Sequence, residues 1–105
     1  MTTSDGTKLL GRWRTDRNDQ RSLGVFGDVS LCFEGNGKLT YTVHLPNKEQ
    51  IMHLTYRVEG AWLVTDQPSS PQEQRSEFFF TREGQLAVKN ESTDPPTLYA
   101  RQSLP

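Results

Sequence analysis

Two histidines are the residues of this chain whose type and placement first suggest chemistry. His44 and His53 flank a turn predicted around residues 47–48, so the hairpin would set the two imidazoles diagonally opposite each other. A pair of imidazoles can bind Zn²⁺ or pass a proton. The alternation of apolar and polar residues turns both rings outward. It does not predict an acidic or thiol side chain nearby that could serve as a third ligand for the metal. We therefore expect solvated histidines and no metal site.

The other reactive side chains lack partners of the right kind. Cys32 lies between two inward-facing residues and so points outward, whereas a catalytic thiol needs a nearby base. Glu73 and Glu77 do not form a matched pair of carboxylates. No motif typical of serine hydrolases, zinc proteases, P-loop enzymes or dinucleotide-binding enzymes occurs. The sequence therefore favours a protein that is not an enzyme, and we expect no catalytic residue and no cofactor.

Tyrosine hydroxyls on the inner faces of the predicted strands are more informative. Tyr41, Tyr56 and Tyr99 would lie among apolar side chains, where buried hydroxyls need partners. If the partners are ligand oxygens, the interior is a small apolar pocket with a few orienting polar groups. If the hydroxyls bond one another, Thr65, the backbone or water, the interior is simply filled. In the first case the candidate ligand-binding residues are Phe33, Tyr41, Val43, Met52, Leu54, Tyr56, Leu63, Phe78, Phe80 and Tyr99.

Hairpins must position these inner residues, and two of the hairpins share one turn design. A three-residue loop ending in Gly37, in the left-handed conformation, would pair Phe33 with Leu39. The same spacing recurs further along the chain and would pair Phe80 with Leu86. Side chains alternate between the two faces of a strand, so these pairings also predict which residues face inward.

Between these two hairpins lies another, whose pairing register depends on where its turn is centred. A turn centred on residues 47–48 would pair Val43 with Met52 and Tyr41 with Leu54, which keeps all four on one face. A further two-residue turn near residues 59–60 would return residues 63 and 65 to the same face.

Together these segments predict an all-β fold. Strands at residues 11–16 and 97–102 bring the total to about eight short antiparallel strands, with no convincing helix. Such a number can close into a barrel and remove its exposed edges, and up-and-down connectivity is the simplest arrangement. We expect an up-and-down meander that forms a small barrel.

Three segments do not fit the strand pattern and are predicted as connections. Residues 17–28 and 67–74 are predicted as loops, and residues 93–96 as a stiff connector. The first loop is long enough to be a lid over one barrel mouth, with Val25 and Phe26 folded inward. The alternative is a surface crossing with a hydrophobic anchor.

Three stretches of the chain resemble one known superfamily. Residues 10–13, Leu-Gly-Arg-Trp, look like its glycine-x-tryptophan motif, residues 33–41 and 56–63 look like its hairpins, and Arg101 matches its closing arginine. The chain thus resembles the calycins, which include the lipocalins and fatty-acid-binding proteins, and especially the short bacterial lipocalin-like domains. The resemblance implies that the Arg101 guanidinium lies across the ring of Trp13 and bonds carbonyls near the N-terminus. Arginine stacks favourably on indole, and this contact would close one end of the barrel.

Size and composition limit the function further. With 105 residues and 12.0 kDa, the chain is predicted to form one domain at residues 10–105, after a flexible tail at residues 1–9. A mean hydropathy of −0.74 predicts that only a small number of apolar side chains are buried and that there is no large lipid-filled cavity. Twelve basic and thirteen acidic residues make nucleic acid and anionic membranes poor partners. The single cysteine and the lack of long apolar stretches favour a soluble, cytoplasmic protein.

An apolar strip on the outer face supplies a second candidate surface. Alternation sends Trp62, Val64 and Phe79 outward, next to Ala87 on the following strand. Such a strip suggests a homodimer or another partner, or a cover formed by the N-terminal segment, although isolated exposed aromatic residues are ordinary.

We expect a lipocalin-like module that binds a small apolar or amphipathic molecule, with residues 17–28 as the rim of the site. The alternative is a non-enzymatic interaction or homodimerising domain with a filled barrel.

Overall fold

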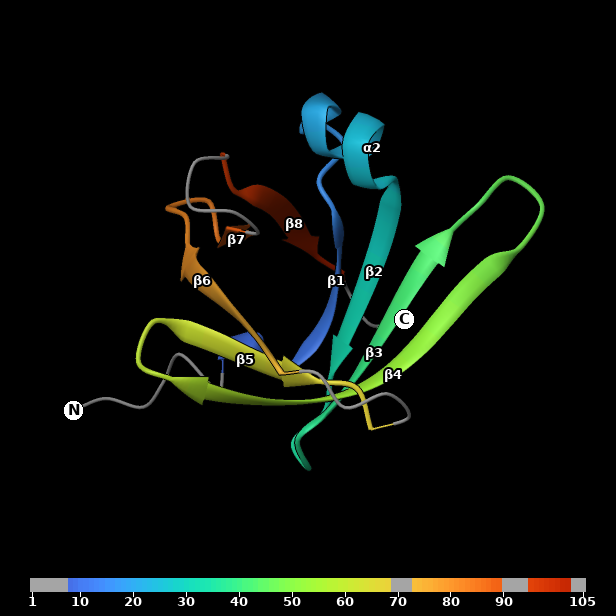
Figure 1. Ribbon diagram of the computed structural model, residues 1–105. Coiled ribbons are helices and arrows are strands. Elements are labelled where there is room, and N and C mark those ends of the chain that lie inside the picture. Colours follow the sequence, from blue (N-terminus) through green and yellow to red (C-terminus); the bar gives the residue numbers. More distant parts are fainter. Residues whose placement is uncertain (1–7, 69–72, 90–94, 103–105) are drawn as a thin grey trace.

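Consecutive strands pair around a closed antiparallel barrel in a computed structural model of the chain (Figure 1). The structure describes residues 8–68, 73–89 and 95–102. Within these residues eight strands follow one another around the barrel, so the predicted all-β meander is confirmed. The strands are β1 Gly11–Thr15, β2 Asp28–Phe33, β3 Lys38–His44, β4 Glu49–Glu59, β5 Trp62–Asp66, β6 Gln74–Phe80, β7 Leu86–Lys89 and β8 Thr97–Arg101.

The two shared turns form as predicted. Gly37 has φ 83° and Gly84 has φ 84°, a left-handed conformation that glycine adopts without steric cost. Each turn is closed by a backbone hydrogen bond of 2.9 Å, from Glu34 to Lys38 in the first and from Thr81 to Gln85 in the second. The pairings of Phe33 with Leu39 and of Phe80 with Leu86 follow from these turns and are confirmed.

The β3–β4 hairpin corrects one predicted register. Tyr41 lies opposite Met52, and Val43 lies opposite Gln50, two positions away from the predicted pairing. The Leu45 amide donates to the Lys48 carbonyl at 2.9 Å, so the turn is centred on Pro46 and the residue after it. Proline has the φ value that the first central position of a turn requires, which explains this placement. A shift of two residues preserves the face of every side chain, so the predicted inner set is unchanged.

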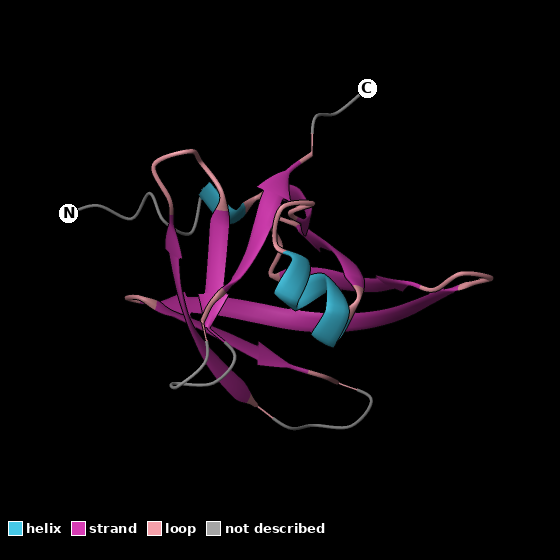
Figure 2. Ribbon diagram, turned by 90° about the horizontal axis from the view of Figure 1, so that it is seen from above, coloured by secondary structure: helices cyan, strands magenta, loops and turns pink. Residues whose placement is uncertain are grey.

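A helix replaces part of the predicted loop at residues 17–28. Helix α2 spans Gln20–Phe26 and lies at the barrel end where β1 ends and β2 begins (Figures 1 and 2). The Asp19 side chain caps it by accepting from the Ser22 amide at 3.1 Å. In the described part of the chain no helix is long and apolar enough to span a membrane.

The helix is anchored by polar groups, which corrects the prediction for Val25 and Phe26. Their exposed fractions are 62% and 39%, so neither folds inward as a lid or a hydrophobic anchor. The fully buried Ser22 instead bonds the Thr97 hydroxyl at 3.2 Å, and the Asp19 carboxylate accepts from the Leu98 amide at 3.0 Å. These bonds tie the helix to the start of β8. The predicted alternation could not reveal them, because the partners are about 75 residues apart in the chain.

The opposite end of the barrel is closed by the contact that the family resemblance implied. The Arg101 guanidinium lies 4.2 Å from the centre of the Trp13 ring and donates to the Leu10 carbonyl at 2.8 Å, and also to the Lys8 carbonyl. The Trp13 indole is 1% exposed and donates to the Leu9 carbonyl at 2.9 Å. Leu9 is itself fully buried, so the core begins within the segment that was predicted as a tail.

Gly11, two residues before Trp13, is required by this closure. It has φ 116°, and a Cβ atom there would lie 3.0 Å from the Arg101 guanidinium.

The buried hydrophobic core extends from this end through the barrel. Its residues are Leu9, Trp13, Val29, Leu31, Phe33, Leu39, Leu63, Phe78, Leu86, Val88 and Tyr99.

Candidate functional site

The barrel contains a partly open cavity of about 370 Å³. Six of the ten predicted ligand-binding residues line it, and they come from five different strands. The volume lies within the range of small-molecule sites, which is about 300–1,000 Å³. These six residues are Phe33, Tyr41, Met52, Leu54, Leu63 and Tyr99.

One side of the cavity is polar, and only part of it was anticipated. Thr65 and Gln74 are cross-strand partners on β5 and β6, and Ser76 lies opposite Leu63 in the same pair of strands. All of them line the cavity, together with residues 66 and 67 at the end of β5. Gln74 was predicted to end the loop of residues 67–74, whereas it is the first residue of β6 and shares the inner face of that strand with Ser76. The site therefore combines an apolar wall with a polar one.

Four predicted ligand-binding residues lie outside the cavity wall. The Tyr56 hydroxyl donates to the Glu34 carbonyl at 2.9 Å, which binds it to the turn between β2 and β3. Phe78 and Phe80 pack edge to face as part of the hydrophobic core, with ring centres 5.9 Å apart, and neither lines the cavity. Phe80 also lies 6.1 Å from the ring of Trp13 at the closed end. Val43 is half-buried and packs against the core without lining the cavity.

Two phenols give the cavity its hydrogen-bonding character. Tyr41 and Tyr99 both line it, and within the described residues neither hydroxyl has a hydrogen bond to the protein. Burial raises the pKa of Tyr99 well above the usual value near 10, with a smaller contribution from Tyr41 nearby, and burial also raises the pKa of Tyr41. Both phenols therefore stay protonated at neutral pH and can donate a hydrogen bond into the cavity.

The two histidines are not brought together. His44 lies opposite Glu49, and His53 lies opposite Thr40, because the true register moves the two rings apart along the strands. Among the described residues no group of three or more histidine, cysteine, aspartate or glutamate side chains could hold a metal ion. Cys32 is half-buried on the outer face.

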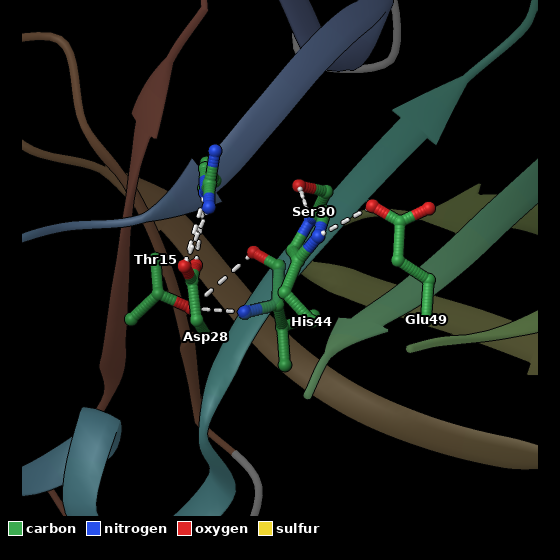
Figure 3. A network of polar contacts seen from close by, with 7 residues as sticks. Thr15, Asp28, Ser30, His44 and Glu49 are labelled. Atoms are coloured by element: carbon green, nitrogen blue, oxygen red, sulfur yellow. Dashed lines mark hydrogen bonds and ion pairs between the residues drawn. The ribbon is translucent and has the colours of Figure 1, made fainter. Parts of the chain in front are cut away.

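His44 instead takes part in a polar network on the outer face of the barrel (Figure 3). Its Nε2 atom lies 2.7 Å from the Ser30 hydroxyl, and its Nδ1 atom lies 3.0 Å from a Glu49 carboxylate oxygen. Sequence analysis missed Ser30 and Glu49. Both occupy outward positions by alternation, but only the correct β3–β4 register places Glu49 opposite His44.

An ion pair borders this network. Arg14 binds both carboxylate oxygens of Asp28, with N–O distances of 2.6–3.2 Å. The hydrogen bonds from Arg14 hold the pKa of Asp28 below its ordinary value, against a smaller opposing effect of burial. Asp28 therefore stays ionised over the whole neutral range.

The predicted outer strip is interrupted. Trp62 and Phe79 are 41% and 46% exposed, but Val64 is only 1% exposed although it faces outward. Its cross-strand neighbours are Arg57 and Arg75, whose side chains form ion pairs on the same face. The prediction that Val64 is an exposed contact residue is therefore wrong. Long arginine side chains can cover an apolar neighbour with their methylene groups.

A scan against models of protein families found no match. Searches of curated proteins and of solved structures found none either.

Proposed function

We propose that this protein binds a small, uncharged amphipathic molecule inside its barrel. The observation that carries the proposal is the cavity of about 370 Å³ with two protonated phenols, Tyr41 and Tyr99, that have no hydrogen-bond partner among the described residues. Donors that line a cavity and have no protein partner favour an occupant that can accept a hydrogen bond, such as one with a carbonyl, ether or hydroxyl oxygen. The resemblance of the chain to lipocalin-like barrels, noted from its sequence, also supports this role.

The shape of the cavity limits the ligand further. At about 30 Å³ for each water-sized group, its volume corresponds to roughly a dozen non-hydrogen atoms. Phe33, Leu54 and Leu63 would contact the apolar body of such a ligand, and Thr65 and Ser76 supply hydroxyls on the opposite side. A one-ring or two-ring compound fits these limits better than a long-chain lipid. The alternative function, association through the outer strip, has less support because Val64 is buried.

Binding of 2-naphthol, followed by its fluorescence, tests the proposal. We expect saturable binding that weakens about 2- to 12-fold in Tyr41→Phe or Tyr99→Phe, the effect of losing one neutral hydrogen bond. Naphthalene, which lacks the hydroxyl, should bind both variants as well as it binds the wild type. Tyr56→Phe is the matched control, because its hydroxyl is bonded to the Glu34 carbonyl outside the cavity. No saturable binding, or equal 2-naphthol affinities in all variants, would contradict the proposal.

A further inference from the structure

A hydroxyl, an imidazole and a carboxylate form a continuous chain across three strands on the outer face of the barrel (Figure 3). Ser30 comes from β2, His44 from β3 and Glu49 from β4. The distances of 2.7 Å from Ser30 Oγ to His44 Nε2 and 3.0 Å from His44 Nδ1 to Glu49 are within hydrogen-bonding range. A nucleophile, a base and a group that orients the base have this order in triads that catalyse acyl transfer.

The network also determines which imidazole nitrogen acts as the base. The Glu49 carboxylate only accepts hydrogen bonds, so it binds the Nδ1–H of His44. In the neutral ring, Nε2 then carries the lone pair and accepts the hydrogen bond from Ser30. This is the protonation state in which the imidazole can take the Ser30 proton.

Asp28 is the direct cross-strand partner of His44, but no hydrogen bond joins the two side chains in the described residues. Both oxygens of Asp28 are bound by Arg14, and His44 reaches diagonally to Ser30. The His44 side chain is 23% exposed and is held on one side by Ser30 and on the other by Glu49. The base is thus oriented by the strands of the sheet.

Next to Ser30 lies a shallow groove that a substrate could enter. It crosses the outer faces of β1, β2 and β3 and is lined by Ser30, Thr40, Thr42, Arg12 and Arg14. Arg12 is exposed and has no ion-pair partner in the described residues. The groove therefore offers positive charge beside a hydroxyl that is hydrogen-bonded to a base.

We propose that Ser30 is a catalytic nucleophile that cleaves small carboxylic esters bound in this groove. The Ser30 oxygen attacks the ester carbonyl carbon while its proton passes to His44 Nε2. The negative oxygen of the tetrahedral intermediate is favoured by the positive charge in the groove. When the carbon–oxygen bond to the leaving alcohol breaks, the alcohol takes the proton from Nε2 and the acyl group remains on Ser30.

Water completes the cycle. It attacks the acyl carbon and gives a proton to His44 Nε2, which returns this proton to Ser30 as the carboxylic acid leaves. The net reaction is the hydrolysis of an ester to an acid and an alcohol. Glu49 is a positioning residue, because it acts on the substrate only through His44. The site lies on the opposite face of the sheet from the cavity, so it does not depend on the proposed ligand binding.

Covalent labelling with diisopropyl fluorophosphate tests this proposal. We expect one phosphoryl adduct per chain, located on Ser30 by peptide mass mapping, and no adduct in Ser30→Ala. His44→Gln should lower the labelling rate about 100-fold or more, the usual contribution of a general base. Glu49→Gln should label more slowly than the wild type, and Arg12→Gln should slow hydrolysis of p-nitrophenyl acetate.

His53→Gln is the matched control, because His53 is an exposed histidine on the neighbouring strand and lies outside the network. It should label at the wild-type rate. Thermal denaturation of every variant separates loss of reactivity from loss of folding. If His44→Gln does not fold, the more conservative substitution Glu49→Gln still tests the network. The proposal is overturned if folded wild-type protein carries no adduct on Ser30, or if folded His44→Gln or Glu49→Gln reacts as fast as the wild type.

Discussion

At the scale of single residues, Trp13 and Arg101 stabilise the barrel and do not contact the cavity. The indole ring is buried, stacked under the guanidinium and bonded to the Leu9 carbonyl. Neither residue lines the interior cavity. Their substitution should therefore affect folding before it affects ligand binding.

Trp13→Ala should lower the free energy of unfolding by about 3–5 kcal/mol, because it removes a large buried aromatic side chain and leaves a cavity. For a domain of this size, such a loss corresponds to a decrease in Tm of at least about 12 °C. Trp62→Ala, at an exposed indole, should change Tm much less. Thermal denaturation followed by circular dichroism measures both. Equal Tm values for Trp13→Ala and the wild type would contradict the role of this residue in closing the barrel.

Asp28 should make stability depend on pH in the acid range. Its pKa in the folded state lies below its ordinary value of 3.8, because Arg14 binds the ionised form. The ionised pair thus stabilises the fold above about pH 4, and this contribution is lost as the pH falls through the lower folded pKa. Urea unfolding between pH 2 and 6 should show a smaller acid-dependent loss in Asp28→Asn than in the wild type. Glu83→Gln, at an exposed turn position, serves as the control and should keep the wild-type profile.

At the scale of elements, helix α2 depends on one side chain that acts at two places. Asp19 caps the helix through the Ser22 amide and also accepts from the Leu98 amide on β8. Loss of this carboxylate frees the helix N-terminus and weakens its attachment to the barrel. The element is therefore stabilised from outside its own short sequence.

Asp19→Ala should destabilise the protein by about 0.5–2 kcal/mol for the cap alone, with a further loss from the bond to β8. Asn18→Ala is the control, because Asn18 is an exposed neighbour whose contact in this region is made by its backbone. Urea denaturation compares the two variants. Equal stability of Asp19→Ala and Asn18→Ala would show that the capping bond contributes nothing measurable.

At the scale of the whole molecule, the outer strip of Trp62 and Phe79 is by itself too small for the interface of a stable dimer. Trp62 and Phe79 are each less than half exposed, and together they present on the order of 200 Å². A stable interface buries about 800 Å² on each partner. The Trp62 ring also lies under Arg75, with 5.5 Å between the guanidinium carbon and the ring centre.

We therefore expect a monomer of 12.0 kDa in solution, measured by light scattering during size-exclusion chromatography. Phe79→Glu should leave that mass unchanged, as should Phe26→Glu at an exposed phenylalanine near the other end of the barrel. A wild-type dimer that only Phe79→Glu dissociates would instead favour the alternative function, association through the outer face.

The sequence by itself determined the fold class, the two bulged turns and the inner or outer face of each strand residue. These features depend on alternation with a period of two and on glycines at fixed spacing, both of which are local. For this reason Phe33 and Leu39 were paired correctly, and an error of two residues in the β3–β4 register still left Tyr41 and Met52 on the inner face.

Only the tertiary structure decided which of these residues form sites. Phe78 and Phe80 face inward as predicted, yet they fill the closed end, because the packing of one ring against another depends on strands distant in the chain. Val64 lies between Arg57 and Arg75 of the two adjacent strands and is buried although it faces outward, which alternation alone does not predict. Ser30, His44 and Glu49 meet because the proline turn sets one particular register. Alternation specifies the face of a residue, whereas its position along the neighbouring strand depends on turn geometry and barrel closure, and contacts between side chains require both.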